Sequence, residues 1–157
     1  MSEIRIDVED PRAGDIVALL RVHLDFSHGE TPPEDAHALD VDGLCDPSIT
    51  FYAARTDGQL LGIGAIRRLD DHHGEIKSMH TAAAARGTGV GRRMVGTLLD
   101  HARAAGFGRV SLETGTTEAF EPARRLYAAC GFERGGPFGS YTAGPNNVFF
   151  TIELSPD

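Results

Sequence analysis

Long apolar runs are missing from this sequence of 157 residues, and no stretch approaches the roughly 20 apolar residues that cross a bilayer. The first residues, 1–5, have neither a basic cluster nor an apolar segment behind them, so we expect no secretory signal. Only two cysteines occur, Cys45 and Cys130, and their spacing is not that of metal ligands. These absences predict a cytoplasmic protein that does not enter a membrane and keeps its thiols reduced.

An excess of basic residues is also missing. The chain has 15 Lys and Arg against 23 Asp and Glu, which gives a formal net charge of −8. Binding of nucleic acid depends on neutralising phosphates with Lys and Arg, so we expect no nucleic-acid partner. Seven histidines are present, but they are scattered apart from His72 and His73, and no spacing suits zinc. We therefore expect no metal site, while the acidic balance is compatible with an amine substrate.

The composition that remains is that of one folded domain over residues 1–157, with 41% hydrophobic residues and 24% charged residues. Apolar periodicity predicts the element order β α α β β β α β α β β. This order joins an antiparallel meander to a βαβ unit. It predicts an α/β (α+β) fold with a mixed, mostly antiparallel central sheet of about six to seven strands and about four flanking helices.

The expected boundaries follow from turn and cap signals. Asp10-Pro11 is predicted to cap a first helix that ends near Ser27, and Thr56-Asp57-Gly58 predicts a hairpin. The other expected helices are a short one around 34–39, one that follows the loop at 86–91, continues through Ala102 and is ended by Gly106, and one at 122–130. The expected strands cover 3–8, 49–55, 59–69, 75–81, 109–114, 132–134 and 148–154.

A glycine-rich loop at 86–91 separates the strand at 75–81 from the following helix. Glycines at 87, 89 and 91 allow a tight turn, and the start of the helix offers unpaired N–H groups and the positive end of its dipole. This arrangement predicts a site for a phosphate or pyrophosphate, with Arg86, Arg92 and Arg93 around the anion. The spacing G-x-G-x-G differs from the dinucleotide fingerprint, and the lysine of a nucleoside triphosphate loop is missing. A plain strand-to-helix turn is the alternative interpretation.

The residues Arg86-Gly87-Thr88-Gly89-Val90-Gly91 resemble the R/Q-x-x-G-x-G/A motif of the GNAT N-acetyltransferase superfamily. A second segment, Ala123 to Phe132, resembles the family's A-x-x-L-Y-x-x-x-G-F segment. The order of the elements also matches, so the resemblance covers nearly the whole chain. It implies the GNAT fold and acetyl-CoA as co-substrate. The cofactor-binding residues that it implies are Met79, His80, Thr81, Arg86, Gly87, Thr88, Gly89, Val90, Gly91 and Arg92.

Transfer of an acetyl group to an amine requires a base, because an ammonium group (pKa about 10.4 for lysine) is not a nucleophile. The resemblance offers two catalytic candidates for this role. Glu75 matches the glutamate of histone-acetylating members, and Glu113 lies where ribosomal-protein acetylating members carry their base. Tyr127 matches the family's tyrosine, which is placed to protonate the departing thiolate, and the alternative is a tyrosine that packs in the core.

Other expectations from the resemblance concern the backbone and the acceptor. The Met79 N–H is expected to face the acetyl carbonyl, and Thr81 to lie in the stretch that pairs with the pantetheine arm. In place of an asparagine that many members have before the tyrosine, this chain has Glu121-Pro122. His37 and Tyr141 are the candidates for substrate binding, with a surface histidine and a loop anchor as the respective alternatives.

These observations predict an N-acetyltransferase that acts on a primary amine of a small molecule or an amino-acid-like acceptor. Three alternatives stay open: a peptide or protein N-acetyltransferase, a non-catalytic acyl-CoA-binding sensor, and a protein that binds nucleotide phosphates through the glycine loop. A homodimer is compatible with the family, and the sequence does not decide it.

Overall fold

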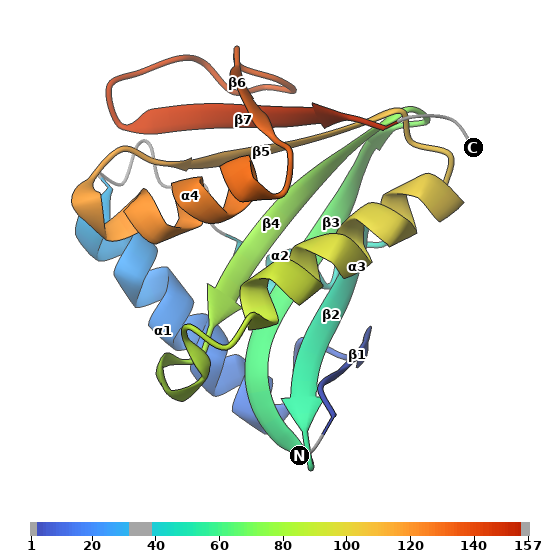
Figure 1. Cartoon of the computed structure of the whole chain (residues 1–157), viewed down its shortest axis with the longest axis vertical. Coiled ribbons are helices and arrows are strands. Elements are labelled where there is room, and N and C mark those ends of the chain that lie inside the picture. Colours follow the sequence, from blue (N-terminus) through green and yellow to red (C-terminus); the bar gives the residue numbers. More distant parts are fainter. Residues whose placement is uncertain (1–2, 32–38, 155–157) are drawn as a thin grey trace.

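The computed structural model describes residues 3–31 and 39–154. A seven-stranded sheet with the order β1-β2-β3-β4-β5-β7-β6 forms its centre (Figure 1). Neighbouring strands are antiparallel except β4 and β5, which are parallel. The strands are β1 Arg5–Val8, β2 Ile49–Thr56, β3 Gln59–Asp70, β4 His73–Thr81, β5 Arg109–Gly115, β6 Glu133–Gly135 and β7 Asn147–Glu153.

Four α-helices cover the two faces of the sheet. They are α1 Gly14–Glu30, α2 Val41–Leu44, α3 Val90–Ala104 and α4 Glu121–Ala129. The strand residues Ala53 and Ala54 show the division, because successive side chains point to opposite faces. Ala53 belongs to the buried cluster of α1 and α2, whereas Ala54 belongs to the cluster of α3 and α4. Figure 1 shows α3 crossing the face formed by β2, β3 and β4.

Helix α3 is amphipathic, and its buried residues recur at the spacing of one helical face. They are Val90, Met94, Val95, Leu98, Leu99 and Ala102. The chain leaves the helix through Gly106, whose φ of +85° is a left-handed conformation that glycine adopts readily. The opposite end of α3, its N-terminus, lies beside the end of β4.

The parallel contact between β4 and β5 is short. Only three residue pairs join them, from His73 with Arg109 to Glu75 with Ser111. Beyond Glu75 the two strands separate, and Figure 1 shows them diverging toward α4 and the start of α3. The split leaves backbone N–H and C=O groups of β4 without a strand partner on this side, which shapes the pocket described below.

A β-bulge lies in β4 within the split. His80 pairs with Ile63 and Lys77 with Ala65, so Ser78 and Met79 stand opposite the single residue Gly64. Ser78 has a φ of +56°, an uncommon value for a residue with a side chain. A Cβ atom on Gly64 would lie 2.8 Å from Met79 Sδ and 2.8 Å from Met94 Cγ, so a side chain there would displace both methionines. The bulge changes the direction of the backbone exactly where β4 has left β5.

The expected fold class and the order of the elements along the chain are confirmed, and most element boundaries agree within a few residues. Three local expectations need correction or fall outside the described residues. The first helix begins at Gly14 and not at Pro11, because Asp10 accepts the Arg12 N–H and forms a separate turn. Strand β4 begins at His73, two residues before the expected strand at 75–81. The expected helix at 34–39 lies almost wholly outside the described residues, and the helix that follows is α2.

Within residues 3–31 and 39–154, every helix is too short or too polar to span a lipid bilayer.

Candidate functional site

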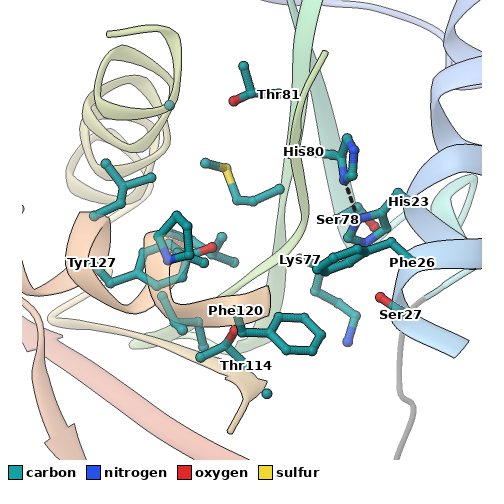
Figure 2. A pocket seen from close by; sticks show the side chains of 18 of the residues that line it. His23, Phe26, Ser27, Lys77, Ser78, His80, Thr81, Thr114, Phe120 and Tyr127 are labelled. Atoms are coloured by element: carbon teal, nitrogen blue, oxygen red, sulfur yellow. Dashed lines mark hydrogen bonds between the residues drawn. The ribbon is translucent and has the colours of Figure 1, made fainter. Parts of the chain in front are cut away.

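A cavity of about 730 Å³ fills the split between β4 and β5. Its walls come from β4, β5, the C-terminal half of α1, the loop before α3, the start of α4 and the beginning of β7. Figure 2 shows Thr81 at one end of the drawn residues, Lys77, Phe120 and Ser27 toward the other, and Tyr127 on the side away from His23 and His80. The cavity therefore runs from the glycine loop to the region around Glu75.

The loop before α3 forms the end of the cavity at which the sequence predicts an anion site. Gly87 and Gly89 have φ values of +77° and +87°, and Gly89 is the residue that caps α3. The Thr88 hydroxyl donates to the Ala85 carbonyl and closes the turn. The N–H groups of the first turn of α3, beginning at Val90, have no partner within the helix. The positive end of the helix dipole lies at the same place, so this turn favours the binding of an anion.

Two of the three expected arginines line the cavity. Arg86 and Arg92 are both exposed and lie beside the glycine loop. Arg93 is not among the residues lining the cavity, and its guanidinium donates to the Ile4 carbonyl at 3.2 Å. The expectation that Arg93 surrounds the anion is therefore wrong, because one residue along a helix turns the side chain by about 100°.

The bulged part of β4 forms one long wall of the cavity. Met79, His80 and Thr81, which the sequence predicted to lie beside the cofactor, are all part of it. Ser78 is buried, and its Oγ has no hydrogen-bond partner in the described part of the chain. Backbone strain at a buried, polar position of this kind is typical of functional sites.

Glu75 lies at the point where β4 and β5 part, and it is almost completely buried, with 2% exposure. Its Oε2 accepts a hydrogen bond from the Tyr141 hydroxyl at 2.6 Å. The Lys77 ammonium donates to Tyr141 Oη at 2.8 Å and to Glu75 Oε2 at 3.3 Å. Glu75 and Lys77 line the cavity, whereas Tyr141 contacts both from the loop between β6 and β7 without being part of the lining.

Glu113 lies on the opposite wall, on β5. Its side chain is half-buried, and its Oε2 accepts a hydrogen bond from Asn147 Nδ2 at 2.6 Å. Both Glu113 and Asn147 line the cavity. The split thus brings together the two carboxylates that the sequence offered as a base, one deeply buried and paired with a cation, the other reachable from the cavity.

Tyr127 of α4 lies on the side of the cavity opposite β4, packed against Phe132 and Phe150. Burial raises the pKa of this phenol well above its usual value of about 10, so the hydroxyl keeps its proton at neutral pH. Pro122 and Ala123, at the start of the same helix, also line the cavity, while Glu121 turns away to pair with Arg125.

A pair of histidines, one from α1 and one from β4, forms the wall of the cavity on the side of α1. The Nδ1 atoms of His23 and His80 lie 3.1 Å apart, and both residues line the cavity. Burial, His80 and Lys77 lower the pKa of His23 to about 4, and burial also lowers that of His80. The pair is therefore neutral at pH 7. Figure 2 shows the hydrogen bond between the two rings.

The structure places most of the predicted site residues around one cavity, with Thr88 closing the loop just behind it. His37 lies outside the described residues. The sequence interpretation gave no role to Lys77, His23 and Asn147, which come from three different elements. For Lys77 a signal existed, because it stands two positions after Glu75 on an expected strand, and such residues share one face.

The site can be compared with known proteins. A model of the acetyltransferase (GNAT) family matches residues 16–132. The chain belongs to the GNAT acetyltransferase family. This acetyltransferase is 40% identical over 151 residues to the uncharacterised N-acetyltransferase YsnE of Bacillus subtilis, which covers 96% of this chain and 100% of the relative. It is 38% identical over 156 residues to an IAA acetyltransferase of Azospirillum brasilense, covering 98% and 100%.

Solved structures agree on the fold of this acetyltransferase. A GNAT-family acetyltransferase from Elizabethkingia anophelis, solved with acetyl-CoA bound, superimposes with a TM-score of 0.71 at 16% identity. The match covers 96% of this chain and 98% of that one. The expected family membership, enzyme class and fold are thereby confirmed.

Proposed function

We propose that this N-acetyltransferase uses acetyl-CoA to acetylate a primary amine of a small molecule, by direct attack of the amine within the cavity between β4 and β5. The observation that carries the proposal is the continuity of this cavity. One end has an anion-binding helix start with two arginines, and the other end has two carboxylates. A long co-substrate with a phosphate at one end and a reactive group at the other requires such a layout.

The residues of the chain suit the binding of the co-substrate. The loop at Gly87 and Gly89 and the first turn of α3 would hold the pyrophosphate, with Arg86 and Arg92 adding charge. The backbone of β4 that has lost its partner strand would pair with the amide groups of the pantetheine arm. When bound, acetyl-CoA supplies the thioester whose acetyl group is transferred.

For the chemistry we assign one proton to each side of the cavity. Glu113 accepts the proton of the incoming ammonium, directly or through water, because it is only half-buried, whereas Glu75 is 2% exposed and is already bound by Tyr141 and Lys77. The nitrogen then bonds to the thioester carbonyl carbon, while the Met79 N–H stabilises the carbonyl oxygen. As the C–S bond breaks, Tyr127 donates its proton to the sulfur, and the second proton that the nitrogen loses on forming the amide returns to the Tyr127 phenolate. Glu75 transfers no proton in this scheme and has a supporting role, with its negative charge balanced by Lys77.

A small acceptor is favoured over a protein. The acceptor end of the cavity is lined by residues of α1 and by Phe120, and Tyr141 contacts its lining residue Glu75. The relative from Azospirillum brasilense, which aligns over almost the whole chain, carries the name of an acetyltransferase that acts on a small molecule. An acyl-CoA sensor would need neither Glu113 nor Tyr127 beside the same cavity.

The first test is calorimetric titration with acetyl-CoA, with ATP and NAD as controls. We expect acetyl-CoA alone to bind, and amines to stimulate release of free thiol. Binding without thiol release for any amine would favour the sensor, and preferential binding of ATP would favour the nucleotide-binding alternative. An absence of binding to acetyl-CoA would overturn the assignment of the cavity.

A further inference from the structure

Lys77 is an unusual residue for the wall of a substrate pocket. Its side chain is only 7% exposed, yet it lines the cavity at the acceptor end. Figure 2 shows the side chain extending from β4 into the cavity, on the same side as Ser27. Burial of an ammonium group costs free energy unless anions and hydrogen-bond acceptors surround it. The groups around Lys77 therefore indicate which further ligand its ammonium can bind.

We propose that Lys77 binds a carboxylate of the acceptor, so that the acceptors of this enzyme are amines that also carry a carboxylate. The proposal rests on the function proposed above and defines the class of substrate for the same site. In this arrangement the amine faces Glu113 on β5, and the carboxylate faces Lys77 on β4.

The hydrogen bonds of Lys77 leave room for this ligand. An ammonium has three N–H donors, and the described partners are Tyr141 Oη at 2.8 Å and Glu75 Oε2 at 3.3 Å. The same Glu75 oxygen already accepts the shorter bond from Tyr141 at 2.6 Å. The direct contact of Lys77 with its counter-ion is therefore long for a charge-assisted hydrogen bond, which usually measures about 2.7–2.9 Å.

The charges along the cavity also favour a zwitterionic acceptor. Among the described lining residues the Lys and Arg side chains are Lys77, Arg86 and Arg92, and the two arginines lie at the glycine loop. His23 and His80, which adjoin Lys77, are neutral at pH 7. Lys77 is thus the cation at the acceptor end. The carboxylates of Glu75 and Glu113 lie at the same end, so we assign the ammonium of the acceptor to Glu113 and its carboxylate to Lys77.

The geometry limits the size of such an acceptor. Lys77 precedes Met79, whose N–H we assign to the acetyl carbonyl, by two positions, which corresponds to at most about 7 Å because the bulge at Ser78 shortens the strand. The Lys77 side chain reaches into the cavity from that point. Only a few bonds can therefore separate the reacting nitrogen from the carboxylate, as in an α- or β-amino acid.

The test uses matched pairs of acceptors: the common L-amino acids and β-alanine, each against its carboxamide, with putrescine as a diamine control. For the wild-type enzyme we expect the acids to exceed their amides in kcat/KM by about 10- to 100-fold, the range of one charge-assisted hydrogen bond. Putrescine should be poorer than either. Lys77→Met should abolish the preference by raising KM for the acids, and Lys77→Arg should retain part of it.

A second variant separates recognition from folding. Lys77→Met leaves the Glu75 carboxylate buried without its cation, so the double variant Glu75→Gln/Lys77→Met removes both charges together. If Lys77 served only as the counter-ion of Glu75, the double variant would keep the preference for acids, and the proposal would be wrong. Acceptance of amides or putrescine in preference to acids by the wild-type enzyme would overturn it too.

Binding of acetyl-CoA is measured for every variant by calorimetry. Normal binding together with loss of the preference supports the proposal. Normal binding with turnover of none of the carboxylate-bearing amines overturns it and leaves the proposed function standing. Failure of the wild-type protein to bind acetyl-CoA would instead overturn the proposed function itself.

Discussion

The Tyr141 hydroxyl donates a hydrogen bond of 2.6 Å to Oε2 of Glu75, although the two residues are 66 positions apart in the sequence. Burial, followed by the charge of Glu75, raises the pKa of Tyr141 far above its ordinary value, so the phenol stays protonated and keeps donating. One oxygen of this carboxylate is thus held by a phenol and an ammonium. This bond distinguishes Glu75 from Glu113, and it underlies the first prediction.

Replacing each carboxylate by its amide separates the two roles. Because general-base catalysis contributes about 10²- to 10⁴-fold, we expect Glu113→Gln to lower kcat/KM by at least about 100-fold. Its residual activity should depend much less on pH. Glu75→Gln should change kcat less and should lower the stability, since it leaves Lys77 buried without an anion.

The measurement is the pH profile of kcat/KM for both variants, with urea unfolding alongside. Glu121→Gln is the matched control, because Glu121 pairs with Arg125 on α4 and points away from the cavity. A Glu113→Gln enzyme with wild-type activity and an inactive but stable Glu75→Gln enzyme would reverse the assignment.

Tyr127 is predicted to act through its hydroxyl and not through its packing. Tyr127→Phe keeps the ring among Phe132 and Phe150, so we expect the fold and the affinity for acetyl-CoA to change little. We expect kcat to fall by about 100-fold, as for loss of a general acid. Tyr52→Phe is the control, since its hydroxyl contacts His101 Nδ1 at 3.0 Å away from the cavity. Full kcat in Tyr127→Phe would rule out the acid role.

The glycine at the start of α3 is predicted to matter for the co-substrate. Gly89 has a φ of +87°, which costs a residue with a side chain about 1–2 kcal/mol. Gly89→Ala should therefore move the N–H groups of the first turn and raise the Kd for acetyl-CoA by about 10-fold or more.

Gly96 in the same helix provides the comparison. It is exposed, and a Cβ there would meet nothing within 4 Å. Gly96→Ala should stabilise the protein by about 0.5–1 kcal/mol and leave binding of acetyl-CoA unchanged, because alanine favours a helix over glycine. Equal effects of the two substitutions on Kd would contradict the anion-binding assignment of Gly89. Calorimetry and urea unfolding provide both values.

The histidine pair predicts how stability depends on pH. His23 has a pKa of about 4 in the folded protein against about 6.5 when unfolded, so the unfolded chain takes up a proton first as the pH falls. The contribution of neutral His23 to the free energy of unfolding is fully present above about pH 6.5. It declines toward pH 4, where the loss reaches roughly 3 kcal/mol.

The check is the difference between wild type and His23→Asn in unfolding free energy at pH 7 and pH 4.5. The variant should show a weaker dependence on pH. His28→Asn serves as the control, because His28 is exposed in the last turn of the same helix. A pH dependence identical in His23→Asn and wild type would show that His23 is not the group that takes up the proton.

Much of the fold could be predicted because its signals are local. The Asp57-Gly58 hairpin, the glycine stops at 106 and 131, and the apolar stripe of α3 each depend on residues close together in the sequence. The start of α1 was misplaced for an equally local reason. Asp10 has two possible uses for its carboxylate, a helix cap or a turn, and only the surrounding structure selects the turn.

The candidate site was predictable where it depends on motifs and not where it depends on distant pairings. Gly87 and Gly89 belong to a local motif, and this motif alone predicts an anion site at the start of α3. The contact of Tyr141 with Glu75 and the pairing of His23 with His80 join elements far apart in the chain. Nothing in the local sequence around Lys77 indicates that it is buried, because burial depends on a loop that arrives 64 positions later.

The short contact between β4 and β5 has a mechanical consequence. Three residue pairs are the backbone connection between the two portions of the sheet, β1 to β4 and β5 to β7. A molecule that fills the split and pairs with the free edge of β4 would connect the two portions of the sheet. We therefore expect the protein to be more rigid with such a molecule bound than without it, and hydrogen exchange along β4 and β5 to be slower in the bound form.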